Sequence, residues 1–295
     1  MKSSGPTRRL RMRGRAVVVF VVVITAALNT LCSPAQAATP PERVMWVWDQ
    51  PDPQALVAAA EARGVTEIFL AVPPNVATSG QLLRIEQTIT GAHAAGIRVS
   101  ALGGDTGWVD NPSWAMTNWV TPTLAVAGFD GLHLDVEPYT SAAWTTGQAE
   151  QVRKFLALLT TINTASGALP VEADVPFWFN TIPSAKKVPL DKAVLSRVDG
   201  VSIMAYRNTA AGPDGSLALS TATLTTAGAM GKYARVGQET TYLGENPSLT
   251  KQTFHGQSLT QMYAQFSLID QALAGTAGYR GIAVHDHAGW NALTP

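Results

Sequence analysis

The stretch Gly128-Phe129-Asp130-Gly131-Leu132-His133-Leu134-Asp135-Val136-Glu137-Pro138-Tyr139 alternates apolar and polar residues from position 132 to position 137. An alternation of two is the period of a β-strand, so His133, Asp135 and Glu137 are predicted to share one strand face. Pro138 cannot donate the next ladder hydrogen bond, which predicts that the strand ends with Glu137 at its mouth. Two carboxylates two residues apart lie only ~7 Å apart along a strand. Their repulsion raises the proton affinity of one of them, as a general acid at neutral pH requires.

Strand-like and helix-like segments alternate along the rest of the chain, which predicts a parallel sheet with helices outside it. The predicted strands are 44–48, 67–72, 98–102, 132–137, 170–175, 200–206, 234–240 and 281–285. Eight such units in about 250 residues are typical of a single α/β domain of the (β/α)8 barrel type, which we assign to residues 38–295. Only ten residues follow the last strand, so we expect the eighth helix to be short or missing.

Several helices carry boundary signals of their own. Asp52 followed by Pro53 is predicted to cap one helix, and Ser258 with Gln261 forms a capping-box pattern for another. The clearest amphipathic helix spans 148–164, and its apolar residues at helical spacing are Val152, Phe155, Leu156, Leu159 and Ile162.

Residues 1–37 have the pattern of a cleavable secretory signal rather than of a folded segment. Five arginines precede an apolar run that starts at Ala16, and Ala35-Gln36-Ala37 supplies the small residues that signal peptidase prefers. The apolar run is too short for a comfortable membrane span, and Cys32 follows Leu31 rather than the small residue of a lipoprotein signal. We therefore expect an exported, extracellular protein without a stable membrane anchor.

The charge of the exported chain excludes some classes of partner. The whole chain has 21 Lys and Arg against 21 Asp and Glu; the first 37 residues hold Lys2 and five arginines, which leaves 15 basic against 21 acidic residues, a net charge of −6. An excess of acid argues against nucleic acid and against an anionic membrane. Cys32 is the only cysteine and leaves with the signal, so we expect a monomer that relies on its hydrophobic core without a disulfide.

Polar side chains gather at the predicted strand ends, where a barrel of this kind places its chemistry. They are Asp49, Asp105, Asp135, Glu137, Glu172, Asp174, Tyr206, Arg207, Glu239, His285, Asp286 and His287. Any single loop-end acid of this set has the alternative role of capping the helix that follows. Asp135 and Glu137 fit that alternative less well, because both are predicted to point inward from a strand.

Tryptophans also follow strand ends, where their flat faces suit stacking on pyranose rings. This set contains Trp48, Trp108, Trp144, Trp178 and Trp290. A buried core role is the alternative for each of them. Trp114 and Trp119 fall in a helical stretch and are expected to pack. The five tryptophans at strand ends predict that the ligand is a carbohydrate.

The segment Asp130 to Glu137 resembles the strand-four signature of the family 18 glycoside hydrolases, the chitinase-like barrels, which reads D-G-x-D-x-D-x-E. The resemblance implies that Glu137 is the proton donor and that Asp135 steers the N-acetyl group of the substrate. Met204-Ala205-Tyr206 resembles the strand-six M-x-Y motif, which implies that the Tyr206 hydroxyl contacts the reacting sugar.

This sequence departs from that pattern at three positions. His133 replaces the middle aspartate, Arg207 follows Tyr206 where Asp or Asn is usual, and His285 stands where the family commonly has a tryptophan. The resemblance and the strand-end positions together give a candidate set. We expect catalysis from Glu137, Asp135, Tyr206 and Glu239, and substrate contacts from Trp48, Asp49, Asp105, Trp108, His133, Asp174, Trp178, Arg207, His285 and His287.

Three alternatives remain open from the sequence. Glu137 and Glu239 occupy the strand positions of two-glutamate retaining glycosidases, in which carboxyls ~5 Å apart make one of them a nucleophile, whereas ~6.5–9.5 Å leaves room for water. His285, His287, His133 and Asp135 are a possible metal set, although no spacing fixes a third ligand, and we expect no cofactor. The last alternative is a carbohydrate-binding barrel that has lost catalysis.

Overall fold

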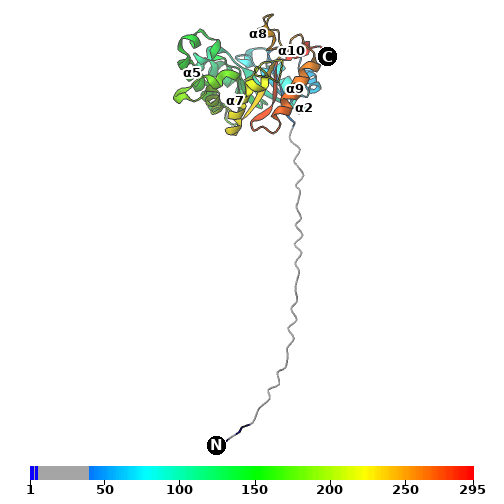
Figure 1. Cartoon of the computed structure of the whole chain (residues 1–295). Coiled ribbons are helices and arrows are strands. Elements are labelled where there is room, and N and C mark those ends of the chain that lie inside the picture. Colours follow the sequence, from blue (N-terminus) through cyan, green and yellow to red (C-terminus); the bar gives the residue numbers. More distant parts are fainter. Residues whose placement is uncertain (3, 6–39) are drawn as a thin grey trace. The chain divides into compact units, whose positions relative to one another are not determined.

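In a computed structural model that describes residues 1, 2, 4, 5 and 40–295, Pro40–Pro295 form one compact unit. Its sheet is a closed barrel in which the strands follow one another in sequence order, and all neighbouring pairs are parallel. The strands are β1 Glu42–Val47, β2 Glu67–Ala71, β3 Arg98–Gly103, β4 Gly131–Leu134, β5 Val171–Pro176, β6 Gly200–Met204, β7 Tyr233–Glu239 and β8 Tyr279–His285. The predicted (β/α)8 barrel is confirmed (Figure 1).

Helices connect the strands on the outside of the barrel. They are α1 Pro53–Ala62, α2 Leu82–Ala94, α3 Pro112–Ala115, α4 Thr121–Leu124, α5 Ala142–Ser166, α6 Leu190–Leu195, α7 Ser216–Ala229, α8 Pro247–Thr250, α9 Leu259–Leu273 and α10 His287–Ala292. The helix that follows the eighth strand is α10, and with six residues it is short, as predicted. The cap at Asp52 and the capping box of Ser258 and Gln261 are also confirmed. Helix α5 starts earlier than predicted and is kinked at Gly147.

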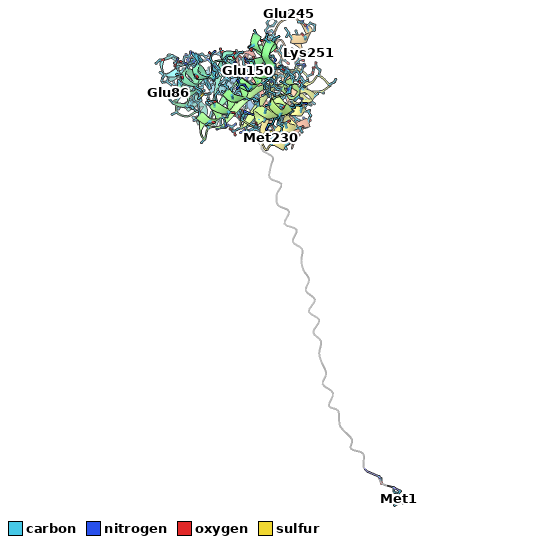
Figure 2. The ribbon with its side chains drawn as sticks, turned by 90° about the vertical axis from the view of Figure 1, so that its left-hand side faces the viewer. Met1, Glu86, Glu150, Met230, Glu245 and Lys251 are labelled. Carbon is cyan, nitrogen blue, oxygen red and sulfur yellow. The ribbon has the colours of Figure 1, made fainter. Side chains whose placement is uncertain are left out.

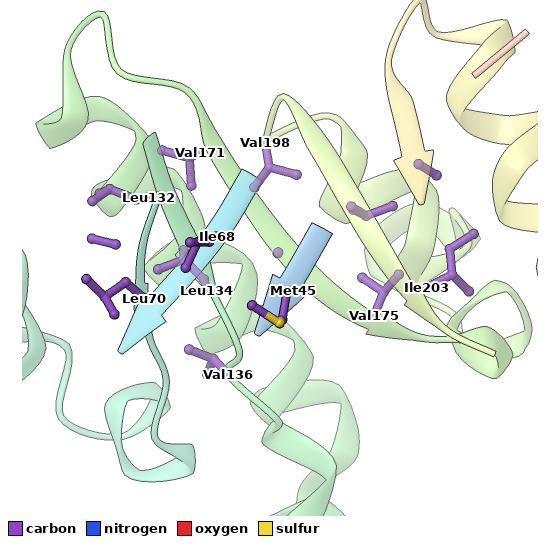
Figure 3. Close-up of a cluster of buried hydrophobic side chains, with 14 of the residues drawn as sticks. Met45, Ile68, Leu70, Leu132, Leu134, Val136, Val171, Val175, Val198 and Ile203 are labelled. Atoms are coloured by element: carbon purple, nitrogen blue, oxygen red, sulfur yellow. The ribbon is translucent and has the colours of Figure 1, made fainter. Parts of the chain in front are cut away.

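The apolar core lies mainly between the strands and the surrounding helices. Leu132, Leu134 and Val136 are buried in this layer, on the side of β4 and its extension opposite to the acids (Figure 3). A smaller apolar cluster fills the inside of the barrel and includes Trp46 and Phe69. The alternation seen in the sequence therefore divides the strand-four segment between an apolar outer layer and a polar interior.

The two ends of the barrel carry different connections. Met230 precedes β7 and Glu245 follows it, and the two residues lie at opposite ends of the domain in Figure 2. Glu137, Tyr206 and Glu239 all fall at or just after the carboxyl ends of their strands. They therefore belong to the end of the barrel where active sites of this architecture are found.

Strand four is shorter than predicted. It ends at Leu134, although the N–H of Asp135 still donates to the carbonyl of Gly103 at 3.0 Å. Beyond that point the β3 segment turns into η2, Thr106–Val109, and no longer offers a ladder partner. A further turn, η4, begins at Pro138.

Of residues 1–37, the predicted signal, the structure describes only residues 1, 2, 4 and 5. The prediction therefore concerns residues outside the described part of the chain. Among the helices that the structure describes, none combines the length and apolar character needed to cross a membrane.

Candidate active site

Glu137 lies just beyond β4 at the mouth of the barrel, and its side chain is half-buried. Tyr139 donates a hydrogen bond to its Oε1. Burial raises the pKa of the Glu137 carboxyl, and the carboxylate of Asp174 raises it further. The hydrogen bond from Tyr139 and the nearby His285 oppose this rise without cancelling it. Glu137 therefore holds its proton to higher pH than a free glutamate, which suits a general acid.

Asp135 lies deeper than Glu137 on the same side of the chain. Burial raises its pKa well above the usual value, and the carboxylates of Asp174 and Glu137 raise it further. Its Oδ1 atom is buried and has no hydrogen-bond partner among the residues that the structure describes. The backbone here passes very close to Gly104, where a Cβ atom would lie 1.9 Å from the Asp135 carbonyl oxygen. A glycine at 104 therefore allows the β3 loop to pack against the two acids.

His133 lies below the acids, at the centre of the barrel. Its side chain has no exposed surface, and its Nε2 is 2.9 Å from Oδ1 of Asp174. The ring stacks on Phe69 with centroids 3.5 Å apart. The other Asp174 oxygen accepts a hydrogen bond of 3.1 Å from the indole of Trp46. The expectation that His133 contacts substrate is therefore not supported, and Asp174, only 4% exposed, belongs to the same buried layer.

The charge of His133 follows from its two acidic neighbours. Burial alone lowers the pKa of a histidine, but the carboxylate of Asp174, followed by that of Glu172, outweighs it and raises the pKa of His133 to about 9. His133 is therefore a cation at neutral pH. Its charge faces the Asp174 carboxyl at hydrogen-bond distance.

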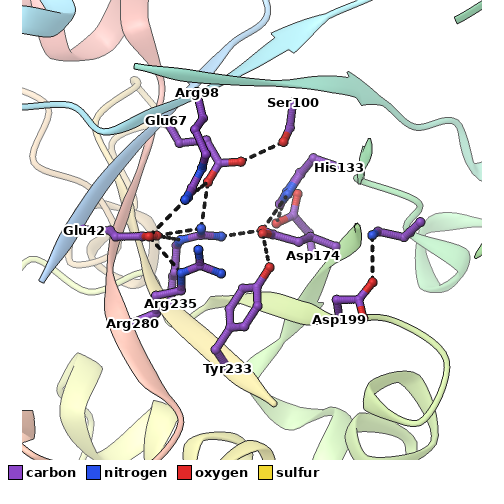
Figure 4. A network of polar contacts seen from close by, with 12 residues as sticks. Glu42, Glu67, Arg98, Ser100, His133, Asp174, Asp199, Tyr233, Arg235 and Arg280 are labelled. Carbon is purple, nitrogen blue, oxygen red and sulfur yellow. Dashed lines mark hydrogen bonds and ion pairs between the residues drawn. The ribbon is translucent and has the colours of Figure 1, made fainter. Parts of the chain in front are cut away.

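A network of ion pairs, buried at Arg235 and partly exposed at Arg98, lies beneath His133 (Figure 4). Arg235 is fully buried and pairs with Glu172, with Glu67 at 2.8 Å and with Glu42 at 2.7 Å. Arg98 pairs with Glu67 at 2.6 Å. These contacts satisfy the carboxylates, so Glu172 has a pKa below its usual value although burial opposes ionisation. Glu172 thus belongs to the structural layer of the barrel, away from its mouth.

Glu239 ends β7 and is 3% exposed. Its Oε1 accepts hydrogen bonds from the backbone N–H of Thr240 at 2.8 Å and from the N–H and hydroxyl of Thr241 at 2.7 and 2.8 Å. Its Oε2 lies 3.0 Å from Nδ1 of His285. A buried carboxylate with one oxygen held by three hydrogen bonds and the other at ion-pair distance from a histidine is poorly suited to attack a sugar carbon.

His285 ends β8 and joins Glu239 to the first strand. Its Nε2 accepts a hydrogen bond of 3.1 Å from the indole of Trp48, which is half-buried just beyond β1. The ring of Tyr206 lies near His285, with centroids 6.2 Å apart. Burial raises the pKa of Tyr206 well above its usual value, and the carboxylate of Glu239 adds to the rise, so its hydroxyl stays protonated. Tyr206 can therefore donate a hydrogen bond at the mouth.

Three other predicted contact residues are engaged in local structure. Arg207 is 8% exposed and pairs with Asp214 at 2.8 Å. The Nδ1 atom of His287 lies 3.0 Å from Asp49. Asp105 is exposed and caps η2 by accepting from the N–H of Gly107 at 2.6 Å. Capping, the alternative role of a loop-end acid, therefore applies to Asp105.

The tryptophans divide into buried and partly exposed groups. Trp108 and Trp290 are 4% and 0% exposed, so in this structure they occupy the buried core role that was the alternative to stacking. Trp119 packs as expected, whereas Trp114 is 46% exposed. Trp144 and Trp178 stay half-buried and pack with Tyr139 and Phe179 beside Glu137. This aromatic cluster and Trp48 are partly accessible aromatic surfaces at strand ends.

Two other features do not coincide with the acids. A hollow of about 840 Å³ lies between α1 and α2 and is lined by helix residues such as Val57, Leu83 and Glu86, none of them a strand-end acid. Within the described ranges, no group of three or more His, Cys, Asp or Glu side chains is arranged to hold a metal ion. The four residues proposed as a metal set are thus not brought together as one.

Comparisons with known proteins add to this geometry. No protein-family model and no curated protein matches the sequence. A class V chitinase from Pseudomonas fluorescens Pf-5 superposes with a TM-score of 0.54 at 13% identity, over 86% of this chain and 98% of that chain. The fold is that of the chitinase-like barrels.

Two further solved structures show how widely this barrel is used. The spore cortex-lytic enzyme SleL of Bacillus megaterium QM B1551 has a TM-score of 0.53 at 12% identity, over 83% of this chain and 70% of that chain. A xylanase and alpha-amylase inhibitor protein from Scadoxus multiflorus has a TM-score of 0.50 at 10% identity, over 86% and 95%. At such identities the likeness concerns the chitinase-like fold, which hydrolases and an inhibitor share.

Two site residues were not among the predicted contacts. Tyr139 bonds Glu137, and Trp46 bonds Asp174. The sequence held a signal for both, because each continues a strand-like alternation, Tyr139 two residues after Glu137 and Trp46 two before Trp48. The strand alternation shows that each residue shares a face with its neighbour two positions away, but it does not show the contact itself. Tyr139 bonds Glu137 on the loop at the mouth, and Trp46 bonds Asp174 on another strand.

Proposed function

We propose that this protein is an exported glycoside hydrolase in which Glu137 protonates the glycosidic oxygen. The observation that carries the proposal is the half-buried Glu137 carboxyl at the barrel mouth, with its pKa raised by burial and by Asp174. Proton transfer from Glu137 accompanies cleavage of the bond between the anomeric carbon and the departing oxygen. The leaving sugar departs as a neutral alcohol, and Glu137 becomes a carboxylate that can then take a proton from water.

Asp135 and Tyr206 are proposed to orient the reacting sugar. Burial and the neighbouring Asp174 and Glu137 raise the pKa of Asp135 well above the usual value, so it holds its proton to higher pH than a free aspartate, and the protonated form can both donate and accept a hydrogen bond. Under the resemblance to family 18, the acetamide oxygen of the substrate attacks the anomeric carbon and Asp135 holds that group. Water then opens the resulting ring and restores the acetamide.

The proposed substrate is an extracellular or cell-wall polysaccharide that contains N-acetylated sugars. A chitinase and a spore cortex-lytic enzyme among the structural neighbours support this class. The partly exposed aromatic side chains near Glu137 support a pyranose ligand. The net charge of −6 expected for the exported chain disfavours a polyanionic glycan.

The experiment measures new reducing ends from a panel of chitin, peptidoglycan and non-acetylated polysaccharides. The wild type is compared with Glu137→Gln and with Glu150→Gln, a change at an exposed glutamate of α5. We expect release from an N-acetylated polymer by the wild type and by Glu150→Gln only. Equal release by the wild type and Glu137→Gln would refute the proposed acid.

A two-glutamate retaining mechanism is the second hydrolytic candidate. Burial of Glu239 and its three hydrogen-bond donors disfavour it as a nucleophile. The test supplies azide to Glu239→Ala with an activated aryl glycoside. A glycosyl azide of inverted configuration would establish Glu239 as the nucleophile, whereas turnover confined to N-acetylated substrates without rescue supports substrate assistance.

A binding barrel without catalysis is the candidate from a different class. An inhibitor protein among the structural neighbours and the departures at His133 and His285 favour it. Binding to a polysaccharide of the panel without any release of reducing ends would select this function over hydrolysis.

A further inference from the structure

A side-chain hydrogen bond at the mouth of the barrel links the residue just after β1 to the end of β8. The indole Nε1 of Trp48 lies 3.1 Å from Nε2 of His285. An indole nitrogen only donates, so Nε2 of His285 must carry a lone pair in this arrangement. The contact is therefore specific for a neutral imidazole with its proton on Nδ1.

Glu239 favours that tautomer. Its Oε2 lies 3.0 Å from Nδ1 of His285, an ion-pair contact without aligned hydrogen-bond geometry, and the sheet register pairs Glu239 with His285 across β7 and β8. The other oxygen of Glu239 is fixed by Thr240 and Thr241. An anion fixed beside Nδ1 keeps a proton on that nitrogen and leaves Nε2 free to accept from Trp48.

We propose that Glu239 and His285 are positioning residues that hold the Trp48 indole in one orientation as a face for the sugar, and that a second proton on His285 releases it. The role of the sugar rests on the function proposed above. With both ring nitrogens protonated, the N–H of His285 and the N–H of Trp48 would face each other across 3.1 Å. Two donors at that separation cannot share a hydrogen bond, so Trp48 loses its anchor.

The groups around His285 determine the pH at which it binds the second proton. The titratable and aromatic groups that face it are Glu239, Asp286, Asp135, Glu137, Tyr206 and Trp46. Burial lowers the pKa of His285, but Glu239 outweighs that effect, and Asp286 and Asp135 add to the rise. The pKa of His285 is therefore raised from its usual value, so the second proton binds at a higher pH than it would to a free imidazole.

The first test follows the indole N–H resonance of Trp48 in protein labelled with nitrogen-15 at tryptophan, with Trp48→Phe used for assignment. Between about pH 5 and about pH 9 we expect the wild-type resonance to move with one midpoint. In Glu239→Gln the midpoint should move to lower pH, because the anion that favours the second proton is gone. In His285→Gln the resonance should stay fixed, because the amide oxygen accepts the same hydrogen bond and does not titrate.

The second test measures binding of N,N′,N″-triacetylchitotriose on both sides of that midpoint. Below it we expect the wild type to bind several-fold more weakly, about the effect of one lost hydrogen bond, while His285→Gln binds equally at both pH values. A wild-type resonance that ignores pH, or one that titrates unchanged in His285→Gln, would overturn the positioning role. A trisaccharide that binds nowhere would count against the proposed sugar, and the resonance titration would still decide the role of His285.

Discussion

Replacing His133 with glutamine removes a buried charge while keeping a hydrogen-bond donor near Asp174. The pKa of His133 is raised to about 9 from its usual 6.5, chiefly by Asp174 acting against burial. At about 1.4 kcal/mol per pKa unit, that difference corresponds to about 3 kcal/mol of unfolding free energy. The pKa is higher in the folded state, so this stabilisation is fully present below about pH 6.5 and is lost as the pH rises through about 9.

The assay is urea denaturation of the wild type and His133→Gln at a series of pH values. We expect the wild type to be more stable by at least about 3 kcal/mol at the acidic end of the window, and the gap to narrow by that amount above about pH 9. Glu137 also binds a proton more tightly in the folded state, but His133 does not contribute to that shift, so its effect largely cancels in the difference. The charge of His133 lowers the pKa of Asp135, so that pKa rises further in His133→Gln.

A surface histidine provides the control for this experiment. His93 lies 2.9 Å from Asp130 and its side chain is 40% exposed, so His93→Gln should cost no more than about 1 kcal/mol. Stability curves for the wild type and His133→Gln that run parallel across the whole pH range would refute the reasoning, because they would show that His133 is not charged in the folded protein.

Three further predictions follow from the same contacts. Tyr139→Phe removes the hydrogen bond that lowers the pKa of Glu137, so the alkaline limb of the pH profile of kcat/KM should move to higher pH; an unmoved or lowered limb would contradict the contact. Arg235→Met leaves Glu67 and Glu172 without their buried partner and should cost about 3–5 kcal/mol in denaturation experiments, whereas Arg153→Met at an exposed pair should leave stability unchanged. Exhaustive chelation should leave turnover intact, because proton donation needs no Lewis acid, and a loss restored by zinc would instead support a metal site.

The alternation at residues 132–137 was sufficient to predict the barrel interior and the common face of His133, Asp135 and Glu137. It could not predict depth, because exposure along a strand depends on register and on what fills the barrel. His133 is therefore buried two residues below Asp135, although both share a face. The sequence placed Glu239 at a strand end as a candidate catalytic residue, but it could not show that the carboxylate accepts hydrogen bonds from N–H groups of the loop that follows it.

The central claim is that Glu137 donates a proton to the leaving group, and a comparison of leaving groups tests it most directly. Turnover of Glu137→Gln is measured on a dinitrophenyl glycoside, whose leaving group needs little protonation, and on an alkyl glycoside of the same sugar, whose leaving group needs it fully. We predict a loss of ~10²–10⁴-fold on the alkyl glycoside and a much smaller loss on the dinitrophenyl glycoside. Equal losses on the two substrates, or a variant that keeps more than about a tenth of wild-type turnover on the alkyl glycoside, would contradict the claim, because a tenfold change is only about 1.4 kcal/mol of transition-state stabilisation.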